Sequence, residues 1–249
     1  AIGFVNEQKL QPDGRVDRRR VALLQQWIDA GLELGNHTFS HQDLHTVSLE
    51  AFQRDVVAGE GVSRELLRKA GKELRYFRHP FLHTGLSGET RRQFESFLKE
   101  RGYVVAPVTV DNYDYQFAAA YDRAVASDDG DVRQKVVRSY LEYMEAVVAY
   151  YEQQSAAIIE REIAQTLLLH ANALNAATID RLAVMLKRRG YRFVSLGDAL
   201  KDPAYQSADA YYGPAGITWL HRWALTQGKK GTFFAGEPAV PEWIELAAR

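Results

Sequence analysis

Short apolar segments alternate with amphipathic segments along about the first 200 residues, and this alternation constrains the fold more than any other feature of the sequence. Apolar runs predict strands at 1–6, 32–34, 76–78, 103–110, 165–169 and 191–195. Helical spacing predicts helices at 17–31, 49–70 with a break near 59–61, 88–101, 115–160 with a break at 127–130, 178–189 and 197–200. This order is typical of parallel strands joined by helices, and it predicts an α/β fold built as a barrel or part of one.

The last 47 or so residues differ in character from the rest of the chain. The segment 211–219 is rich in tyrosine and glycine, and further aromatic residues follow it. A segment of this length is too short to bury a core alone. We therefore expect one domain at 1–202 and an aromatic-rich C-terminal tail at 203–249 that packs on the same domain.

Charge and composition exclude several classes of function. The net charge is −1, with no basic block, which argues against a nucleic-acid partner. No apolar run reaches the roughly 18 residues of a membrane span. The absence of cysteine removes disulfides, thiolate metal sites and cysteine nucleophiles.

Polar side chains follow four of the expected strands at their carboxyl ends. They are His37, Arg78, Asp111 and His170. The carboxyl ends of parallel strands meet at one edge of a sheet or barrel, where loops form the sites of such folds. The sequence therefore predicts a shared site at this edge.

Two histidines four residues apart, His37 and His41, are the strongest candidates for metal ligands. Neutral imidazoles suit zinc, and a hydrolytic zinc site typically has three protein ligands and a water molecule. His45 continues the spacing, so three rings would share one face if 37–45 were helical. The other interpretation of His45 is a surface residue in a polar loop.

Four short segments carry a resemblance to a known family. They are residues 36–41 (Asn-His-Thr-Phe-Ser-His), 77–81 (Phe-Arg-His-Pro-Phe), 111–115 (Asp-Asn-Tyr-Asp-Tyr) and 167–170 (Leu-Leu-Leu-His). In this order they resemble motifs two to five of the polysaccharide deacetylases of the NodB-homology type, also called carbohydrate esterase family 4. The resemblance implies a distorted (β/α) barrel and a hydrolase that removes acetyl or small acyl groups from carbohydrate or aryl esters.

The resemblance also implies a metal site and a proton donor. His37 and His41 would hold a divalent metal ion, expected to be zinc, and His170 would be the general acid. Arg78 would orient an acidic catalytic base.

The remaining motif residues would shape the surroundings of these groups. Asp111 and Asp114 would lie beside His170 and adjust its charge, while Pro80, Phe81 and Tyr115 would form walls of the substrate groove.

The chain departs from the family at its first motif, a pair of aspartates that supplies the base and a third metal ligand. In the family this motif precedes the strand that here begins at Ala1, so we expect the first strand and the pair to be missing and the metal to be held weakly. The opening without methionine suggests a processed or truncated chain. An unpaired strand edge would favour homo-oligomers. The resemblance suggests a secreted or periplasmic protein, although the sequence shows no signal peptide.

Two other functions stay open at the level of sequence. Ser40 precedes His41 directly and could serve a metal-independent esterase, although the chain has no Gly-x-Ser-x-Gly turn. Loss of the base and of a ligand is also what a carbohydrate-binding pseudoenzyme would show, with Tyr211, Tyr212, Trp219 and Trp223 as candidates for stacking on sugar rings. The expected partner is an acetylated carbohydrate or a small ester.

Overall fold

A computed structural model describes residues 1–248 and divides the chain into two compact units. Unit 1 comprises Ala1–Pro107 and Ala210–Ile217. Unit 2 comprises Val108–Asp209 and the described residues from Thr218 onward. These bounds differ from the expected ones: the expected domain at 1–202 is divided between the two units after Pro107, and the segment Ala210–Ile217 of the expected tail belongs to unit 1.

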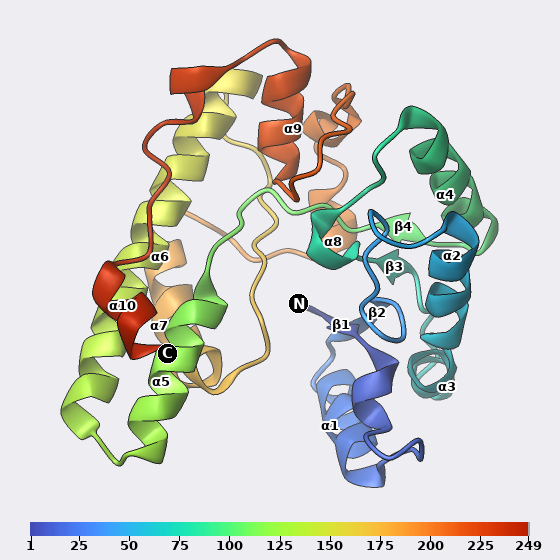
Figure 1. Cartoon of the computed structure of the whole chain (residues 1–249), viewed down its shortest axis with the longest axis horizontal. Helices are drawn as coiled ribbons and strands as arrows, with labels where there is room; N and C mark the ends of the chain where they lie inside the picture. The colour runs from blue at the N-terminus through green and yellow to red at the C-terminus, as the bar shows by residue number, and fades with distance from the viewer. Residues whose placement is uncertain (249) are drawn as a thin grey trace. The chain divides into compact units, whose positions relative to one another are not determined.

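Unit 1 is built on a parallel sheet. Its strands are β1 (Ile2–Val5), β2 (Glu33–Asn36), β3 (Tyr76–Phe77) and β4 (Val104–Val105), in the order β1-β2-β3-β4 (Figure 1). All neighbours pair in parallel, with Ile2 opposite Glu33 and Asn36 opposite Phe77. Strands in simple sequential order are the arrangement of a barrel wall. The predicted α/β class with a parallel sheet is confirmed, and the short run of strands agrees with an incomplete barrel.

Helices cover the sheet and connect its strands. They are α1 (Arg18–Asp29), α2 (Leu49–Ala58), α3 (Gly61–Lys69) and α4 (Gly88–Glu100), with short 3₁₀ turns at η1 (Glu7–Leu10) and η2 (Pro80–Leu82). Asp17, Ser48 and Ser87 each accept a hydrogen bond from a backbone N–H in the first turn of α1, α2 and α4, as N-cap residues do. The predicted break near 59–61 is confirmed. The core of unit 1 includes Leu34, Phe52, Val56, Leu67, Phe77, Phe94 and Leu98.

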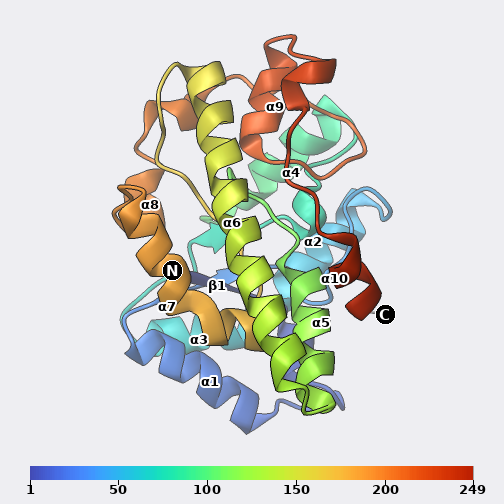
Figure 2. The ribbon, with the colours of Figure 1, turned by 90° about the vertical axis from the view of Figure 1, so that its left-hand side faces the viewer.

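Unit 2 is mainly helical. Its helices are α5 (Asp114–Ala126), α6 (Gly130–Ile159), α7 (Ala173–Arg188), α8 (Leu196–Ala199), α9 (Trp219–Thr226) and α10 (Glu242–Ala247), with 3₁₀ turns at η3 (Pro203–Gln206) and η4 (Gly231–Phe234). The long helix α6 packs against α5, α7 and α9 (Figure 2). Its buried side chains recur at helical spacing, as in Val136, Tyr140, Tyr143, Met144, Val147 and Tyr151. The predicted long helical zone with a break at 127–130 is confirmed.

Three strand predictions are wrong in extent. Within 103–110 only β4 forms, and 165–169 contributes a single parallel bridge between Val110 and Leu167. The segment 191–195 forms no strand, and Phe193 has 58% of its surface exposed. A β-branched and aromatic run needs a partner strand to become a strand, and the run alone does not supply one. No helix within residues 1–248 has the length and apolar character required to cross a membrane.

Candidate functional site

The carboxyl end of β2 leads into a tight turn that holds the first candidate residues. The Asn36 side chain is fully buried, and its amide nitrogen donates to the Val56 carbonyl at 2.9 Å and to the Tyr103 hydroxyl at 3.0 Å. Its Oδ1 accepts from the Thr38 backbone N–H at 2.7 Å. The Thr38 hydroxyl oxygen in turn accepts from the His41 N–H at 2.9 Å. This chain of hydrogen bonds fixes the path of residues 36–41.

His37 and His41 lie together on this turn. Their ring centroids are 4.8 Å apart and the rings meet edge to face. Nδ1 of His37 lies 2.7 Å from the Arg78 carbonyl oxygen, which can only accept, so Nδ1 carries the proton and the ring lone pair is on Nε2. In metal-binding histidines, the ring nitrogen that does not bind the metal commonly donates its N–H to a backbone carbonyl, which fixes the orientation of the ring. The pair therefore has the donor chemistry of two metal ligands.

Backbone conformation at this turn differs from a helix. Thr38 has φ of 63° and His41 has φ of 60°, in the left-handed region that non-glycine residues rarely adopt. Residues 37–45 are not helical, so the condition under which His37, His41 and His45 would share one helical face is not met. Strained backbone of this kind gathers at functional sites, where the surrounding structure holds it in place.

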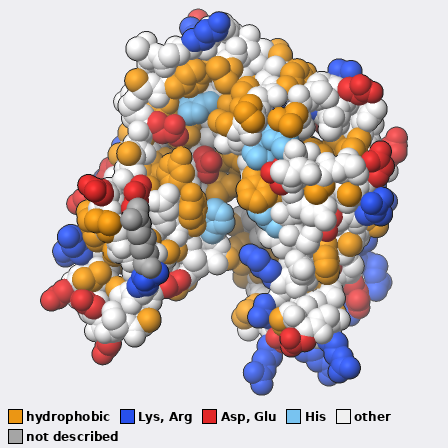
Figure 3. All heavy atoms as spheres, viewed as in Figure 1, with side chains coloured by type: hydrophobic (Ala, Val, Ile, Leu, Met, Phe, Trp, Pro, Cys, Tyr) orange, Lys and Arg blue, Asp and Glu red, His pale blue; other side chains and the backbone are white. Residues whose placement is uncertain are grey.

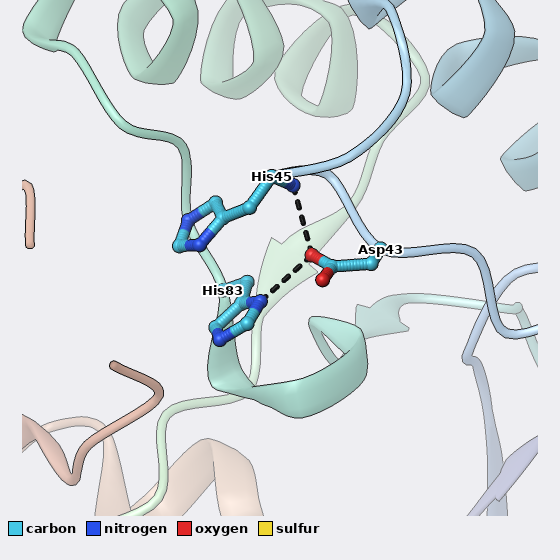
Figure 4. Close-up of side chains that lie close together, drawn as sticks. All are labelled: Asp43, His45 and His83. Atoms are coloured by element: carbon cyan, nitrogen blue, oxygen red, sulfur yellow. Dashed lines mark hydrogen bonds and ion pairs between the residues drawn. The ribbon is translucent and has the colours of Figure 1, made fainter. Parts of the chain in front are cut away.

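His45 belongs to a different group. Its ring stacks on His83 with centroids 3.9 Å apart and planes 9° from parallel. One ligand atom each from Asp43, His45 and His83 lie within 4.8 Å of one another (Figure 4). Among the described residues this is the one group of at least three such side chains close enough to share a metal ion, and it does not include His37 or His41.

The loop after β3 forms the surroundings of the pair in unit 1. The Arg78 side chain is buried, its Nε donates to the Ala106 carbonyl at 2.8 Å, and its guanidinium lies 4.4 Å from the centroid of the Phe4 ring. Pro80 is buried and begins η2. Phe81 is 53% exposed, and its ring lies 4.5 Å from His41, edge to face. Phe81 thus presents an exposed apolar ring beside the histidine pair.

Ser40 is engaged in a structural contact. Its hydroxyl donates to Oδ1 of Asp55 at 2.8 Å, and its backbone N–H donates to Oδ2 at 3.0 Å. The Phe39 N–H donates to the Asp55 carbonyl as well. A nucleophilic serine needs a base that accepts its proton, and here the hydroxyl is directed to a carboxylate that ties the turn to α2. The arrangement gives the Ser40 and His41 alternative no support.

The second group of candidates lies in unit 2, where Asp114 and His170 form a hydrogen-bonded pair. Asp114 is fully buried, and its Oδ1 accepts from Nδ1 of His170 at 2.6 Å. Its Oδ2 accepts from the His170 backbone N–H at 2.8 Å and from Nδ2 of Asn175 at 2.6 Å. A carboxylate on Nδ1 fixes the tautomer of the ring and stabilises its protonated form.

Two residues that the sequence did not single out complete this network. Nδ2 of Asn175 also donates to the His170 carbonyl at 2.8 Å, and Oδ1 of Asn175 accepts from the Tyr140 hydroxyl at 2.6 Å. Asn175 and Tyr140 are both buried. The only sequence signal for Asn175 is its place one turn after Asn172, the N-cap of α7, whose side chain accepts from the Asn175 N–H.

Asp111 and Tyr115 lie near the same pair within unit 2. Burial raises the pKa of Asp111, while the hydrogen bond from the Asn112 N–H and the nearby His170 act in the opposite direction. The Tyr115 ring is 6.1 Å from that of His170, and the residue is 51% exposed. Tyr115 therefore offers an aromatic surface beside the imidazole.

Histidine side chains reach the surface beside hydrophobic ones in the space-filling view (Figure 3). Within unit 1 the structure brings together His37, His41 and Phe81, with the Arg78 carbonyl bound to Nδ1 of His37. Within unit 2 it brings together Asp111, Asp114, Tyr115 and His170. Each group comes from loops that follow an expected strand.

Comparison with solved structures gives weak similarities to carbohydrate esterase family 4. A CE4 family pseudoenzyme from Bacillus anthracis is 17% identical, with 80% of this chain and 55% of that chain covered and a TM-score of 0.47. A family 4 carbohydrate esterase from Streptomyces lividans, in complex with acetate, is 18% identical, with 80% and 81% covered and a TM-score of 0.47. The Xyl-CE4 domain of a multidomain xylanase from the hindgut metagenome of Trinervitermes trinervoides is 15% identical, with 88% and 81% covered and a TM-score of 0.47.

The chain spans little more than half the length of the Bacillus anthracis protein, 55%. No curated protein matches the sequence. The family model for polysaccharide deacetylase matches residues 1–103. That range contains β1 to β3, the His37 and His41 pair and the Arg78 loop. Residues 1–103 are therefore similar to the polysaccharide deacetylase family.

Proposed function

We propose that this protein is a metal-dependent hydrolase that removes acetyl groups from esters of carbohydrates or small alcohols. The observation that carries the proposal is the His37 and His41 pair, with Nδ1 of His37 held by the Arg78 carbonyl at 2.7 Å, inside the range that matches the deacetylase family. A hydrolase of this class needs a Lewis acid at the acetyl carbonyl and a donor for the leaving oxygen. In unit 1 the His37 and His41 pair offers ligands for the Lewis acid, and in unit 2 His170 offers a proton donor.

His37 and His41 fit a divalent metal ion as an imidazole pair, although hydrolytic zinc sites usually have three protein ligands. A bound zinc or cobalt ion would polarise the acetyl carbonyl and make water more acidic. With two protein ligands we expect the ion to be held weakly. Phe81 would lie against the acyl or sugar part of the substrate and keep water from that side.

His170 would act as the general acid. Its Nδ1 is committed to Asp114, so the proton available for transfer is on Nε2 of the imidazolium form. Asp114 stabilises that form and keeps the ring oriented. A leaving alkoxide or phenoxide would take the Nε2 proton as the ester bond breaks. Amide substrates should react more slowly, since a leaving amine depends more strongly on proton transfer.

A non-catalytic carbohydrate-binding protein is the second candidate, and the exposed aromatic side chains of Phe81 and Tyr115 favour it. Such a protein would use Phe81 and Tyr115 as aromatic surfaces and would bind sugars without turnover. The two candidates make opposite predictions for turnover.

Hydrolysis of 4-nitrophenyl acetate before and after treatment with a strong chelator tests the proposal. We expect the rate to fall to that of the His37→Gln and His41→Gln double variant and to return when zinc or cobalt is added. Ser40→Ala should retain the wild-type rate within a few-fold. A chelator-resistant rate that Ser40→Ala abolishes would replace the metal mechanism with the serine mechanism, and binding of acetylated oligosaccharides without turnover would establish the second candidate.

A further inference from the structure

Asp43, His45 and His83 form a cluster that the proposed hydrolysis does not use. Asp43 and His45 lie on the loop between β2 and α2, and His83 lies just after η2 (Figure 4). One ligand atom from each lies within 4.8 Å of the others. Two imidazoles and one carboxylate are a donor set that zinc, cobalt and nickel accept.

Hydrogen bonds hold the Asp43 carboxylate in a fixed orientation. Oδ1 of Asp43 accepts from Nδ1 of His83 at 2.7 Å and from the His45 backbone N–H at 2.8 Å. Burial opposes the ionisation of Asp43, but these hydrogen bonds and the two histidines outweigh it and lower the pKa of the carboxyl. An ionised carboxylate is the form that binds metal.

The backbone near His83 and His45 has unusual conformations that position these two side chains. Phe81 and Leu82 have φ of 56° and 55°, both in the left-handed region, and they set the direction in which the chain reaches His83. The Gly85 N–H donates to Nε2 of His45 at 3.2 Å, so the lone pair of that ring is on Nε2. Gly85 itself has φ of 104°, which a residue with a side chain rarely adopts, and this conformation places its N–H at the imidazole.

We propose that Asp43, His45 and His83 bind a divalent transition-metal ion at a site separate from His37 and His41. The centroid of the Phe81 ring lies 4.5 Å from that of His41 and 5.7 Å from that of His83. Phe81 therefore lies beside both the histidine pair and the proposed second site.

Metal binding exchanges hydrogen bonds for coordination bonds in this cluster. The ion takes Oδ1 of Asp43 and Nδ1 of His83 in place of the proton that they share, and that proton moves to Nε2 of His83. At His45 the ion takes the Nε2 lone pair in place of the Gly85 N–H. The stacked rings must open for both nitrogens to face the ion. His37 undergoes no such change, because its Nδ1 proton stays on the Arg78 carbonyl.

Zinc stoichiometry of the full chain, measured by equilibrium dialysis and elemental analysis, tests the proposal. We expect two ions on the wild type, one on His45→Gln with His83→Gln, and one on His37→Gln with His41→Gln. His170→Gln, which alters a histidine outside both groups, should keep the wild-type stoichiometry. Retention of two ions by the His45 and His83 double variant, or loss of all zinc from the His37 and His41 double variant, would overturn the second site.

A further variant and a spectroscopic measurement keep the test independent of folding and of hydrolysis. Asp43→Asn retains an oxygen that can accept the His45 N–H, and we expect it to lower zinc affinity at this site by at least about tenfold with an unchanged circular dichroism spectrum. In long-range ¹H–¹⁵N spectra, zinc should convert His83 from the Nδ1–H to the Nε2–H tautomer and shift the Gly85 amide. An unchanged His83 tautomer at saturating zinc would contradict the proposal, whatever the outcome for ester hydrolysis.

Discussion

At the scale of single residues, buried polar groups hold the candidate side chains in position. The amide nitrogen of Asn36 joins β2 to α2 and to Tyr103, and its amide oxygen holds the Thr38 N–H. The amide nitrogen of Asn175 likewise donates to Asp114 and to the His170 carbonyl, and its oxygen accepts from Tyr140. A buried side-chain amide that makes all its hydrogen bonds stabilises the fold, while a buried amide that has lost a hydrogen-bond partner destabilises it. The imidazoles that carry the proposed chemistry therefore depend on amides that do not take part in it.

Replacement of Tyr140 by phenylalanine tests this dependence in unit 2. Tyr140→Phe removes the donor to Oδ1 of Asn175 and leaves a buried acceptor, which we expect to cost about 1–3 kcal/mol of stability. Because Asn175 then has less to hold it against Asp114, kcat for ester hydrolysis should fall on the order of tenfold, and the pH at which the rate declines should move.

Tyr143→Phe is the matched control for this variant. Tyr143 is buried on the same helix, but its hydroxyl accepts from the Tyr113 backbone N–H. We expect Tyr143→Phe to lose stability by a similar amount, measured by urea unfolding, while the pH–rate profile stays that of the wild type. Equal profiles for both variants would show that Tyr140 has a purely structural role.

The sequence could predict which residue types follow the strands but not what supports them. His37, Arg78, Asp111 and His170 could be identified because each stands directly after an apolar run. Asn36, Asp55 and Asn175 could not, because a buried hydrogen-bonded side chain and a solvated one have the same place in a linear pattern. The cluster at Asp43 was missed for another reason: His83 is 38 residues from His45, and only the fold shows that they stack.

At the scale of elements, caps and periodicity predicted the helices far better than apolar runs predicted the strands. A helix is defined by contacts within itself, so residues such as Ser48 and Gly59 mark its ends locally. A strand exists only with a neighbour, and the run at 191–195 has no strand partner among the described residues. Helices could therefore be predicted from local sequence signals, whereas strands could not, because their pairing is not visible in the sequence.

Gly59, between α2 and α3, shows how an element boundary shapes the candidate site. A Cβ at this position would lie 2.6 Å from the Thr38 carbonyl carbon and 2.7 Å from the Phe39 nitrogen, both backbone atoms that cannot move aside easily. We expect Gly59→Ala to cost about 1–3 kcal/mol. The displaced turn should also weaken zinc binding at His37 and His41.

Gly61→Ala is the control, because a Cβ there would meet only Oε2 of Glu7, at an ordinary 3.7 Å. Gly61 begins α3, whose N–H groups at Val62 and Ser63 are already capped by Glu7. We expect this substitution to be neutral or to stabilise by up to about 1 kcal/mol. Thermal unfolding and zinc titration of the two variants compare them directly, and equal behaviour would remove the close approach of α2 to the turn as a constraint on the site.

At the scale of the whole molecule, two units with separate cores carry separate titrating groups. In unit 2, His221 is 6% exposed and its ring lies among Tyr150, Tyr151 and Phe234. Its Nε2 lies 3.1 Å from the Tyr150 hydroxyl. Burial lowers the pKa of His221 to about 4. The folded unit 2 therefore keeps this histidine neutral at pH values where an unfolded chain would protonate it.

Acid should consequently destabilise unit 2 before it affects unit 1. The neutral histidine contributes its stability fully above the unfolded pKa of 6.5, and that contribution is lost as the pH falls from 6.5 toward about 4. The loss amounts to at most about 3 kcal/mol.

Hydrogen exchange between pH 7 and pH 4.5, corrected for intrinsic rates, tests this prediction. Protection should fall in α6 and α9, while β2 and α2 of unit 1 serve as the internal reference. His221→Phe keeps an aromatic ring in the cluster and removes the titration, so protection of α6 should then depend less steeply on pH. An unchanged slope in this variant, or an equal loss of protection in both units, would assign the acid sensitivity to groups other than His221.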